Sequence, residues 1–343
     1  MEQIYTPTKD YKVLVRCMTY NQSKYIKDAL NGFAMQKTDF PFVCLVVDDA
    51  STDGEQEVIK SWMAHECDMT QADNVEIEKS FVTLVPHKKN ANCTFAFYFL
   101  KENLYGTGEK TPLIAPWREH CKYEALCEGD DYWIDETKIQ RQSYILDTYP
   151  NIQMVYTDYE TVDEKSFPIY REKYEKILKP MSKTGDNLPF LMKRNYPLTV
   201  TILIRKEIIE NEFYKNSPST IDYALFLAAA FVGDFYYMSE KTSAYRLNPN
   251  SLTQKQKDKI IEALLEIKKY ASQVYVCENV KKENLKNDIK IGYQILYHSI
   301  YPNVKIQYKG FWKLIIKKRP LFFLCIPIVF AIKVIKNIIK HEE

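Results

Sequence analysis

Four short apolar runs decide what kind of fold this chain adopts. They are YKVLVRC (residues 11–17), FVCLVV (42–47), FVTLV (81–85) and YEALC (123–127), and each has the length of a strand and is nearly all apolar. A strand with one face in water alternates between apolar and polar residues, whereas a strand buried on both faces is apolar throughout. The runs therefore predict a sheet that is covered on both faces.

Helical patterns lie between these runs. Ile26, Leu30 and Phe33 recur at the spacing of one helix face, and a second helix is predicted from about residue 55 to 63. Strands and helices in alternation are typical of an α/β fold with a mainly parallel sheet flanked by helices. Ligands of such sheets bind beyond the carboxyl ends of the strands.

The alternation is less regular elsewhere. Residues 86–121 form an unusually long connection before the fourth run, and we interpret this connection as an insertion. Further along, we predict strands at 151–156 and 199–204, a short helix at 221–231, two short strands at FYYM (235–238) and SAYRL (243–247), and a long amphipathic helix from Thr253 that begins a C-terminal helical appendage.

Composition excludes several classes of protein. A chain of 343 residues exceeds the size at which one core stops growing, so one large domain with an appendage, or two domains, is expected. The sequence contains nine glycines and neither G-x-G-x-x-G nor G-x-x-x-x-G-K-S/T, which argues against dinucleotide and P-loop sites. Its eight cysteines form no C-x-x-C pair and MEQIYTPTKDYK has no apolar signal region, so we expect a reducing, cytoplasmic location.

The C-terminal residues 305–343 carry a charge of +7, from nine Lys/Arg and two Glu, which leaves −5 on the rest of the chain. An acidic body of this kind argues against nucleic-acid binding. The longest uncharged stretch, Pro320 to Ile332, has thirteen residues, and a bilayer span needs about 20. We predict a basic amphipathic tail that associates with the inner face of the cell membrane. A helix packed on protein is the alternative.

Three carboxylates crowd together in CEGDDYWID (127–135), directly after the fourth run. Glu128, Asp130 and Asp131 repel one another, so something must offset their charge. A Mg²⁺ or Mn²⁺ ion does so, because it prefers oxygen ligands together with substrate phosphates. An acidic loop that leads into the next helix is the alternative.

Other polar residues also follow predicted strands or begin a helix. Asp48 and Asp49 end the second run, where they bind base or ribose donors or cap a helix. Tyr20 and Asn21 follow the first run, and the tyrosine either stacks on a planar base or is a turn aromatic. Asp222 lies in the first turn of an apolar helix, where it acts as a general base or complements the helix dipole.

In combination, three stretches of this sequence resemble the family-2 glycosyltransferases. They are VLVRCMTYNQSKYIKDALNGFAMQ, FVCLVVDDASTDG and KYEALCEGDDYWIDETKIQRQ. The resemblance covers residues 11–150 well and extends more loosely to about 250. It implies a nucleotide-sugar-dependent, usually inverting enzyme with the GT-A fold, whose sheet is Rossmann-like.

The resemblance also implies roles for matching residues. Tyr20, Asn21 and Asp49 would line the nucleotide pocket, with Asp48 beside them. Asp130 and Asp131 would serve the ribose and the metal ion that bridges the diphosphate. Asp222 would deprotonate the acceptor hydroxyl. The chain departs from the pattern at Glu128, which replaces the first acid of the D-x-D motif, at Ile221, where many relatives have an acid, and at Asn248, where many have a histidine.

The predicted function is metal-dependent, inverting transfer of a sugar from a nucleotide-diphosphate sugar to a glycan or lipid-linked acceptor in surface polysaccharide biosynthesis. UDP is the predicted donor nucleotide. The predicted domains are a glycosyltransferase domain at 1–250, with a nucleotide-binding half at 11–150 and an acceptor half at 151–250, then the appendage at 251–304 and the tail at 305–343. An inactive scaffold that binds a nucleotide or a protein partner is the alternative. A nucleotidylyltransferase is disfavoured, because VRCMTYNQ supplies no Gly- and Lys-rich phosphate loop.

Overall fold

The computed structural model describes residues 4–172, 174–192, 194–249, 251 and 255–274. The chain divides into two compact units. Of the described residues, the first unit comprises those in the ranges 4–187, 196–214 and 228–248, and the second comprises those in the ranges 188–195, 215–227 and 249–274. The predicted tail and the appendage beyond residue 274 lie outside the described residues. In the described part, no helix has the length and hydropathy that crossing a membrane requires.

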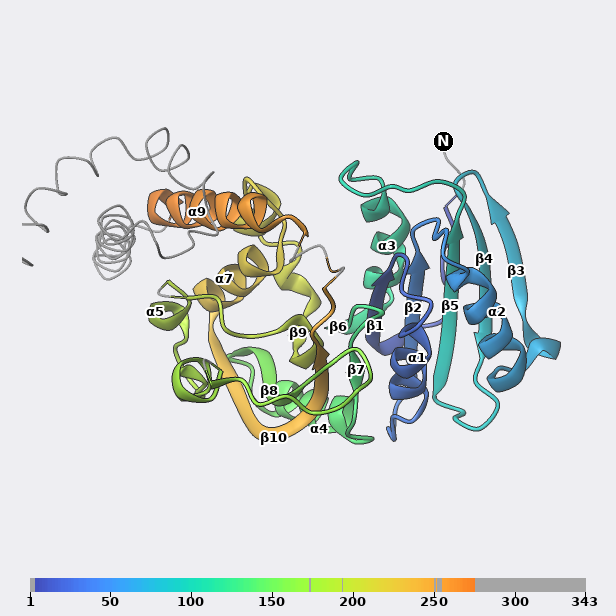
Figure 1. Ribbon diagram of the computed structural model, residues 1–343, viewed down its shortest axis with the longest axis horizontal. Helices are drawn as coiled ribbons and strands as arrows, with labels where there is room; N and C mark the ends of the chain where they lie inside the picture. The colour runs from blue at the N-terminus through green and yellow to red at the C-terminus, as the bar shows by residue number, and fades with distance from the viewer. Residues whose placement is uncertain (1–3, 173, 193, 250, 252–254, 275–343) are drawn as a thin grey trace, which may run out of the picture. The chain divides into compact units, whose positions relative to one another are not determined.

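The first unit is built on a ten-stranded mixed sheet with the strand order β3-β4-β5-β2-β1-β6-β9-β8-β10-β7 (Figure 1). Its four central strands are parallel, and they include three of the four apolar runs. This centre confirms the predicted α/β fold with a mainly parallel sheet. The central strands are β5 (Cys93–Leu100), β2 (Phe42–Asp48), β1 (Tyr11–Thr19) and β6 (Cys121–Leu126).

Further strands extend the sheet on both sides of this centre, and their pairings are antiparallel except for the parallel pair of β8 and β10. On one side lie β4 (Ser80–Pro86) and β3 (Asp73–Ile77). The strands on the other side are β9 (Leu203–Arg205), β8 (Ile152–Val162), β10 (Asp234–Arg246) and β7 (Tyr132–Trp133). The two short strands predicted at FYYM and SAYRL are one long strand, β10, whose register against β8 shifts where bulges interrupt it.

Alternate residues of β2 enter two different cores, which explains why the strand is apolar throughout. Phe42, Cys44 and Val46 pack in the core formed with the first two helices, while Val43, Leu45 and Val47 pack in the core on the opposite face. Helices α1 (Ile26–Ala34), α2 (Glu55–Glu66) and α4 (Lys138–Thr148) contribute to the first core, and α3 (Lys110–Glu119) contributes to the second (Figure 1).

The interpretation of residues 86–121 as an insertion is wrong. This segment supplies β5, which pairs in parallel with β2 in the middle of the sheet, and then α3. The sequence of β5, CTFAFYFL, is apolar on both faces, as a central strand requires. The chain runs from β2 to β5 through the antiparallel pair β3 and β4, so the crossover is longer than a single helix.

The remaining helices include two that bear on the predictions. Helix α7 (Asp222–Val232) begins at Asp222, close to the predicted start, and its residues from Tyr223 to Ala229 are all buried. Helix α9 (Lys257–Val274) is the described part of the predicted long helix. Asp222 falls in the second unit together with α9. The predicted domains, with a boundary at residue 250, stay a prediction. The shorter helices include α5 (Leu188–Leu191), α6 (Glu212–Lys215) and the 3-10 turn η4 (Thr199–Thr201).

Candidate active site

The carboxyl ends of β1, β2 and β6 lie at one edge of the sheet, because these strands are parallel neighbours. Thr19 is paired with Asp48, so the residues that follow β1 lie beside those that follow β2. The segment Glu128–Asp131 follows β6 on the other side of β1. The structure thus brings together all the predicted nucleotide- and metal-binding residues at this edge.

The loops after β1 and β2 are tied to each other. Asn21 adopts a left-handed backbone conformation with φ of 55°, and its side-chain oxygen accepts a hydrogen bond from the backbone N–H of Thr52 at 2.8 Å. The backbone N–H of Asn21 donates to Ser51 Oγ at 2.9 Å. Tyr20 remains 46% exposed, which leaves its ring accessible to a planar base. Asn21 therefore shapes the loop, and Tyr20 presents a surface.

Asp48 is fully buried and incompletely hydrogen-bonded. Its Oδ1 accepts from the N–H of Ser51 and from Gln56 Nε2, at 3.2 and 2.6 Å, but its Oδ2 has no hydrogen-bond partner. Burial raises the pKa of this carboxyl group. A buried carboxylate oxygen without a donor is costly, so the fold keeps this acid at a cost in stability.

Glu55 is a second buried acid at this edge, and sequence analysis missed it. Its carboxylate accepts hydrogen bonds from Thr19 Oγ1, from the N–H of Gln22 at 2.8 Å and from Ser51 Oγ at 2.9 Å. Burial raises its pKa. Glu55 thus joins the loops after β1 and β2 to the start of α2. The signal was present, since Glu55 directly follows the turn glycine Gly54, but an acid in the first turn of a helix is common.

Asp49 holds the connection between β5 and α3. Its Oδ1 accepts from the N–H of Leu104 at 2.7 Å, and its Oδ2 forms an ion pair with Lys110 Nζ at 2.7 Å. The Asp49 side chain is 5% exposed. Both partners lie in the segment interpreted as an insertion, so sequence analysis did not foresee them. The predicted contact of Asp49 with a base stays a prediction.

The E-G-D-D segment, Glu128–Asp131, directly precedes β7. Because β7 pairs with β10, this segment lies next to the end of β10. Trp133 is opposite Ser243 and Tyr132 is opposite Ala244, so the preceding acids meet the residues after Ala244. Asp131 Oδ1 accepts from the backbone N–H of Arg246 at 2.8 Å. Asp130 Oδ2 accepts from Asn248 Nδ2 at 2.9 Å. Asn248 therefore bonds directly to one of the predicted ligand-binding carboxylates.

Gly129 keeps the E-G-D-D segment close to the loop after β1. A Cβ atom at this position would lie 2.3 Å from Thr19 Oγ1 and 2.5 Å from Gln22 Oε1. These distances are far below van der Waals contact, so any other residue would push the acids away from β1. Glu128 is anchored on its other side, because its Oε2 accepts from Thr199 Oγ1 at 2.8 Å.

The three acids carry more negative charge than their surroundings neutralise. Burial raises the pKa of Glu128 and Asp130, and burial together with the charge of Asp130 raises the pKa of Asp131 well above its ordinary range. A divalent cation would relieve this cost. In the described part of the chain, no three His, Cys, Asp or Glu residues are arranged to hold a metal ion by themselves. Mg²⁺ is often held in proteins by one or two carboxylates together with the phosphate oxygens of a substrate.

Asp222 lies in the second unit, at the first turn of α7. Its Oδ1 accepts a hydrogen bond from the N–H of the next residue, Tyr223, at 2.8 Å. The Tyr223 hydroxyl donates to the carbonyl of Leu191 at 3.0 Å and so anchors the start of the helix. This geometry suits a helix-terminal acid, and the role of Asp222 as a general base stays a prediction.

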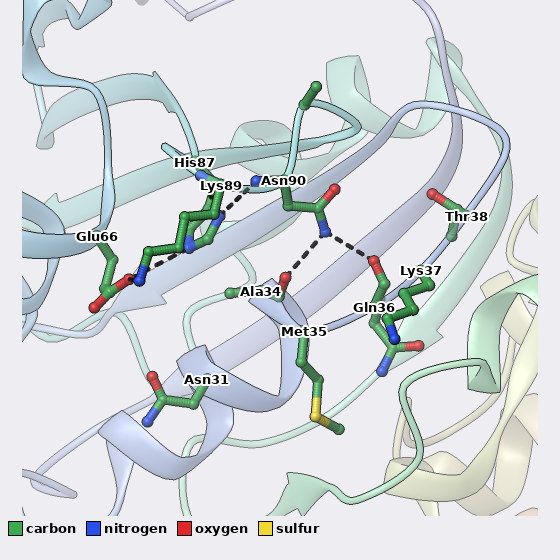
Figure 2. Close-up of a pocket in the computed structure, with 11 residues that line it drawn as sticks. Asn31, Ala34, Met35, Gln36, Lys37, Thr38, Glu66, His87, Lys89 and Asn90 are labelled. Atoms are coloured by element: carbon green, nitrogen blue, oxygen red, sulfur yellow. Dashed lines mark hydrogen bonds and ion pairs between the residues drawn. The ribbon is translucent and has the colours of Figure 1, made fainter.

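A separate pocket of about 530 Å³ lies at the opposite edge of the sheet, where β2 and β5 begin (Figure 2). Asn90 closes one side of it by donating to the carbonyls of Ala34 and Gln36, at 2.9 and 2.7 Å. Glu66, His87 and Lys89 line another side. None of the predicted site residues lines this pocket, so it is distinct from the candidate active site.

Comparison with protein families agrees with this geometry. The model of glycosyl transferase family 2 matches residues 17–81, which include the ends of β1 and β2. Glycosyl transferase family 2 is thus the family that residues 17–81 resemble, and the match covers less than half of the chain. Three relatives, uncharacterized proteins of Mycobacterium bovis and of two strains of Mycobacterium tuberculosis, are 25% identical to it over 247 residues. These matches cover 68% of this chain and 58% of each relative, so the chain spans less than two thirds of the relatives' length.

Solved structures with the same fold include two glycosyltransferases. TarS of S. aureus in complex with UDP is 15% identical with a TM-score of 0.50, and the match covers 94% of this chain and 87% of that one. The mannosyltransferase PcManGT of Pyrobaculum calidifontis, in complex with GDP-Man and Mn²⁺, is 12% identical with a TM-score of 0.54, and the match covers 97% and 90%. The fold of this chain is thus of the GT-A type.

Proposed function

We propose that this chain is an inverting glycosyltransferase that moves a sugar from a nucleotide-diphosphate sugar to a hydroxyl group of a glycan or lipid-linked acceptor. UDP is the proposed donor nucleotide, and GDP is the alternative. Structures with this fold hold UDP in TarS and GDP-Man in PcManGT, so both bases fit the architecture. The proposed setting is surface polysaccharide biosynthesis, which suits a lipid-linked acceptor.

One observation carries the proposal. Asp130 and Asp131 are buried at the carboxyl edge of the parallel sheet with raised pKa values, and the buried acid Asp48 ends β2 at the same edge, on the other side of β1. A fold does not gain stability from burying adjacent carboxylates, so their place here favours a functional role. Three such acids suit a ligand that brings a divalent cation and sugar or base N–H and O–H donors. A nucleotide diphosphate with its metal ion is such a ligand.

The proposed roles of these residues are metal binding, nucleoside binding and proton transfer. A bound Mg²⁺ or Mn²⁺ would neutralise the charge that develops on the leaving diphosphate. Asp131 and Asp130 would hold that ion, and Glu128, the other carboxylate of the same segment, would bind it through water. Tyr20, Asn21, Asp48 and Asp49 would bind the nucleoside. Asp222 would take the proton from the acceptor hydroxyl as the oxygen attacks the anomeric carbon from the face opposite the diphosphate.

The proposal is tested with a panel of nucleotide sugars incubated with Mn²⁺, Mg²⁺ or EDTA. We expect release of one nucleotide with a divalent ion and none with EDTA. Asp131→Ala is expected to lose this release, whereas Asp222→Ala is expected to keep nucleotide binding and lose sugar transfer. Nucleotide binding without turnover, even with acceptors present, would favour the inactive scaffold. Absence of any nucleotide binding would contradict the site assignment.

We also propose that residues 305–343, which lie outside the described residues, bind the membrane surface. Each Lys or Arg near an anionic surface contributes about 1 kcal/mol, so replacing Lys317, Lys318 and Arg319 with glutamine is expected to weaken binding about 100-fold. Sedimentation of the full chain with phosphatidylglycerol-containing vesicles measures this, with pure phosphatidylcholine vesicles as the control. Equal binding to both vesicle types would rule out an electrostatic contribution.

A further inference from the structure

Arg246, the last residue of β10, is bonded to both acids of the E-G-D-D segment. Its Nε donates to the backbone carbonyl of Asp130 at 2.9 Å, and its backbone N–H donates to Asp131 Oδ1 at 2.8 Å. The Arg246 side chain is 1% exposed. It therefore contacts the acids from within the protein, and its guanidinium is occupied by protein groups.

The other end of the guanidinium is held by two segments distant in sequence. Nη2 forms an ion pair with Asp28 Oδ2 of α1 at 2.7 Å. Nη1 donates to the turn at 163–166, with distances of 3.3 Å to the carbonyl of Asp163, 3.2 Å to the carbonyl of Glu164 and 3.0 Å to Ser166 Oγ. The guanidinium carbon also lies 4.7 Å from the ring centre of Tyr25 and 5.2 Å from that of Tyr132.

These contacts use a property that arginine has and lysine lacks. The planar guanidinium fixes its N–H groups in different directions, so one side chain ties together the E-G-D-D segment, α1 and the 163–166 turn. A lysine ammonium would keep the charge, but it would not reach all of these acceptors. Because Arg246 is buried, its ion pair with Asp28 is also the contact that offsets the cost of burying its charge.

We propose that Arg246 is a positioning residue for Asp130 and Asp131, the carboxylates of the proposed nucleotide-sugar site. Asp28 and the 163–166 turn hold Arg246 in place. The inference rests on the proposed function, since it assumes that Asp130 and Asp131 bind a nucleotide diphosphate with a divalent cation. Groups that support metal ligands from behind typically change metal affinity about 10- to 100-fold when they are mutated. The affinity of the donor site thus depends on Asp28, an α1 residue that acts through Arg246.

The test compares Arg246→Lys and Asp28→Asn with Arg141→Lys. Arg141 is a matched control, because it also bridges two acids of the first unit, Asp135 and Glu240, but it is one-third exposed. Binding of UDP and of GDP to the full chain is measured by calorimetry across a series of Mn²⁺ concentrations, and free Mn²⁺ is followed by electron paramagnetic resonance. Melting temperatures are recorded in parallel.

We expect Arg246→Lys to weaken Mn²⁺ binding in the presence of nucleotide about 10-fold or more, and Asp28→Asn to weaken it by a smaller factor. Excess Mn²⁺ should restore nucleotide binding in both variants. A purely structural role would instead lower the fraction of protein that binds and leave the Mn²⁺ affinity unchanged, and that result would overturn the proposal. So would an equal loss of affinity in Arg141→Lys. If the wild type binds neither nucleotide, the proposed function fails along with this inference.

Discussion

Asp131→Asn is expected to abolish metal-dependent turnover of the donor while the protein stays folded. Asparagine has almost the same shape as aspartate and can still accept the hydrogen bond from the N–H of Arg246. It lacks the charge that would hold the divalent cation. Stabilisation of charge by a metal ion is worth several kcal/mol in a transition state, so we expect a loss of about 100-fold or more in donor hydrolysis.

The stability of Asp131→Asn is not expected to fall along with its activity. Burial and Asp130 hold the pKa of Asp131 well above its ordinary range, so the folded state binds this proton more tightly than the unfolded state does. As the pH rises above the ordinary pKa, keeping the residue charged costs stability. Removal of the charge is therefore expected to leave the melting temperature at pH 7 unchanged or higher.

Donor hydrolysis in the presence of Mn²⁺ measures the loss of turnover, and thermal melting with and without Mn²⁺ and nucleotide measures the stability and the binding of both ligands. The wild type should gain stability when both ligands are added, and Asp131→Asn should not. Asp10→Asn serves as the control, since Asp10 is 88% exposed and lies before β1, away from the carboxyl edge. A variant that keeps full activity, or one that melts well below the wild type, would contradict the assignment of Asp131.

Glu124→Gln is expected to cost about 3–5 kcal/mol of stability, because it leaves two arginines without their counter-charge. Glu124 is in β6 and is 1% exposed. Its Oε1 accepts from Arg16 Nε at 2.6 Å and its Oε2 accepts from Arg118 Nε at 2.7 Å. Both arginines are mostly buried, so with glutamine at this position their positive charges would be buried without a negative partner in Glu124.

The cluster of Glu124, Arg16 and Arg118 also predicts how the free energy of unfolding depends on pH. Burial alone would raise the pKa of Glu124, but the two arginines outweigh it and bring the pKa below its ordinary value. The stabilisation is therefore present above the ordinary glutamate pKa, and it is lost as the pH falls through the lowered pKa. Urea unfolding at neutral and acidic pH measures the difference in free energy of unfolding between the wild type and Glu124→Gln. This difference should be smaller at acidic pH. Glu160→Gln is the matched control, since Glu160 pairs with Lys241 at a partly exposed site and should change stability by less than about 1 kcal/mol. Equal effects of the two substitutions at neutral pH would refute the burial argument.

Local pattern was enough to predict most of the sheet's centre and the place of the site. Residues apolar on both faces must be covered on both faces, so β1, β2 and β6 were recognisable without tertiary information. Since parallel strands end at one edge, the acids after β2 and β6 had to lie near each other. The same rule applied to β5, whose apolar sequence was equally clear, but the length of the segment around it favoured an insertion. The pairing of Lys110, in this segment, with Asp49 was therefore not predicted.

Strand direction, which the sequence pattern predicts, is enough to gather Asp48, Asp49, Asp130 and Asp131 at the carboxyl edge of the sheet. The contacts of each acid, in contrast, follow only from the folded arrangement of distant segments. The Asp131–Arg246 contact joins residues 115 positions apart, and the Asp49–Lys110 pair joins residues 61 apart. Such contacts depend on the register of strands that are far apart in the sequence, and local propensity carries no information about register across that distance.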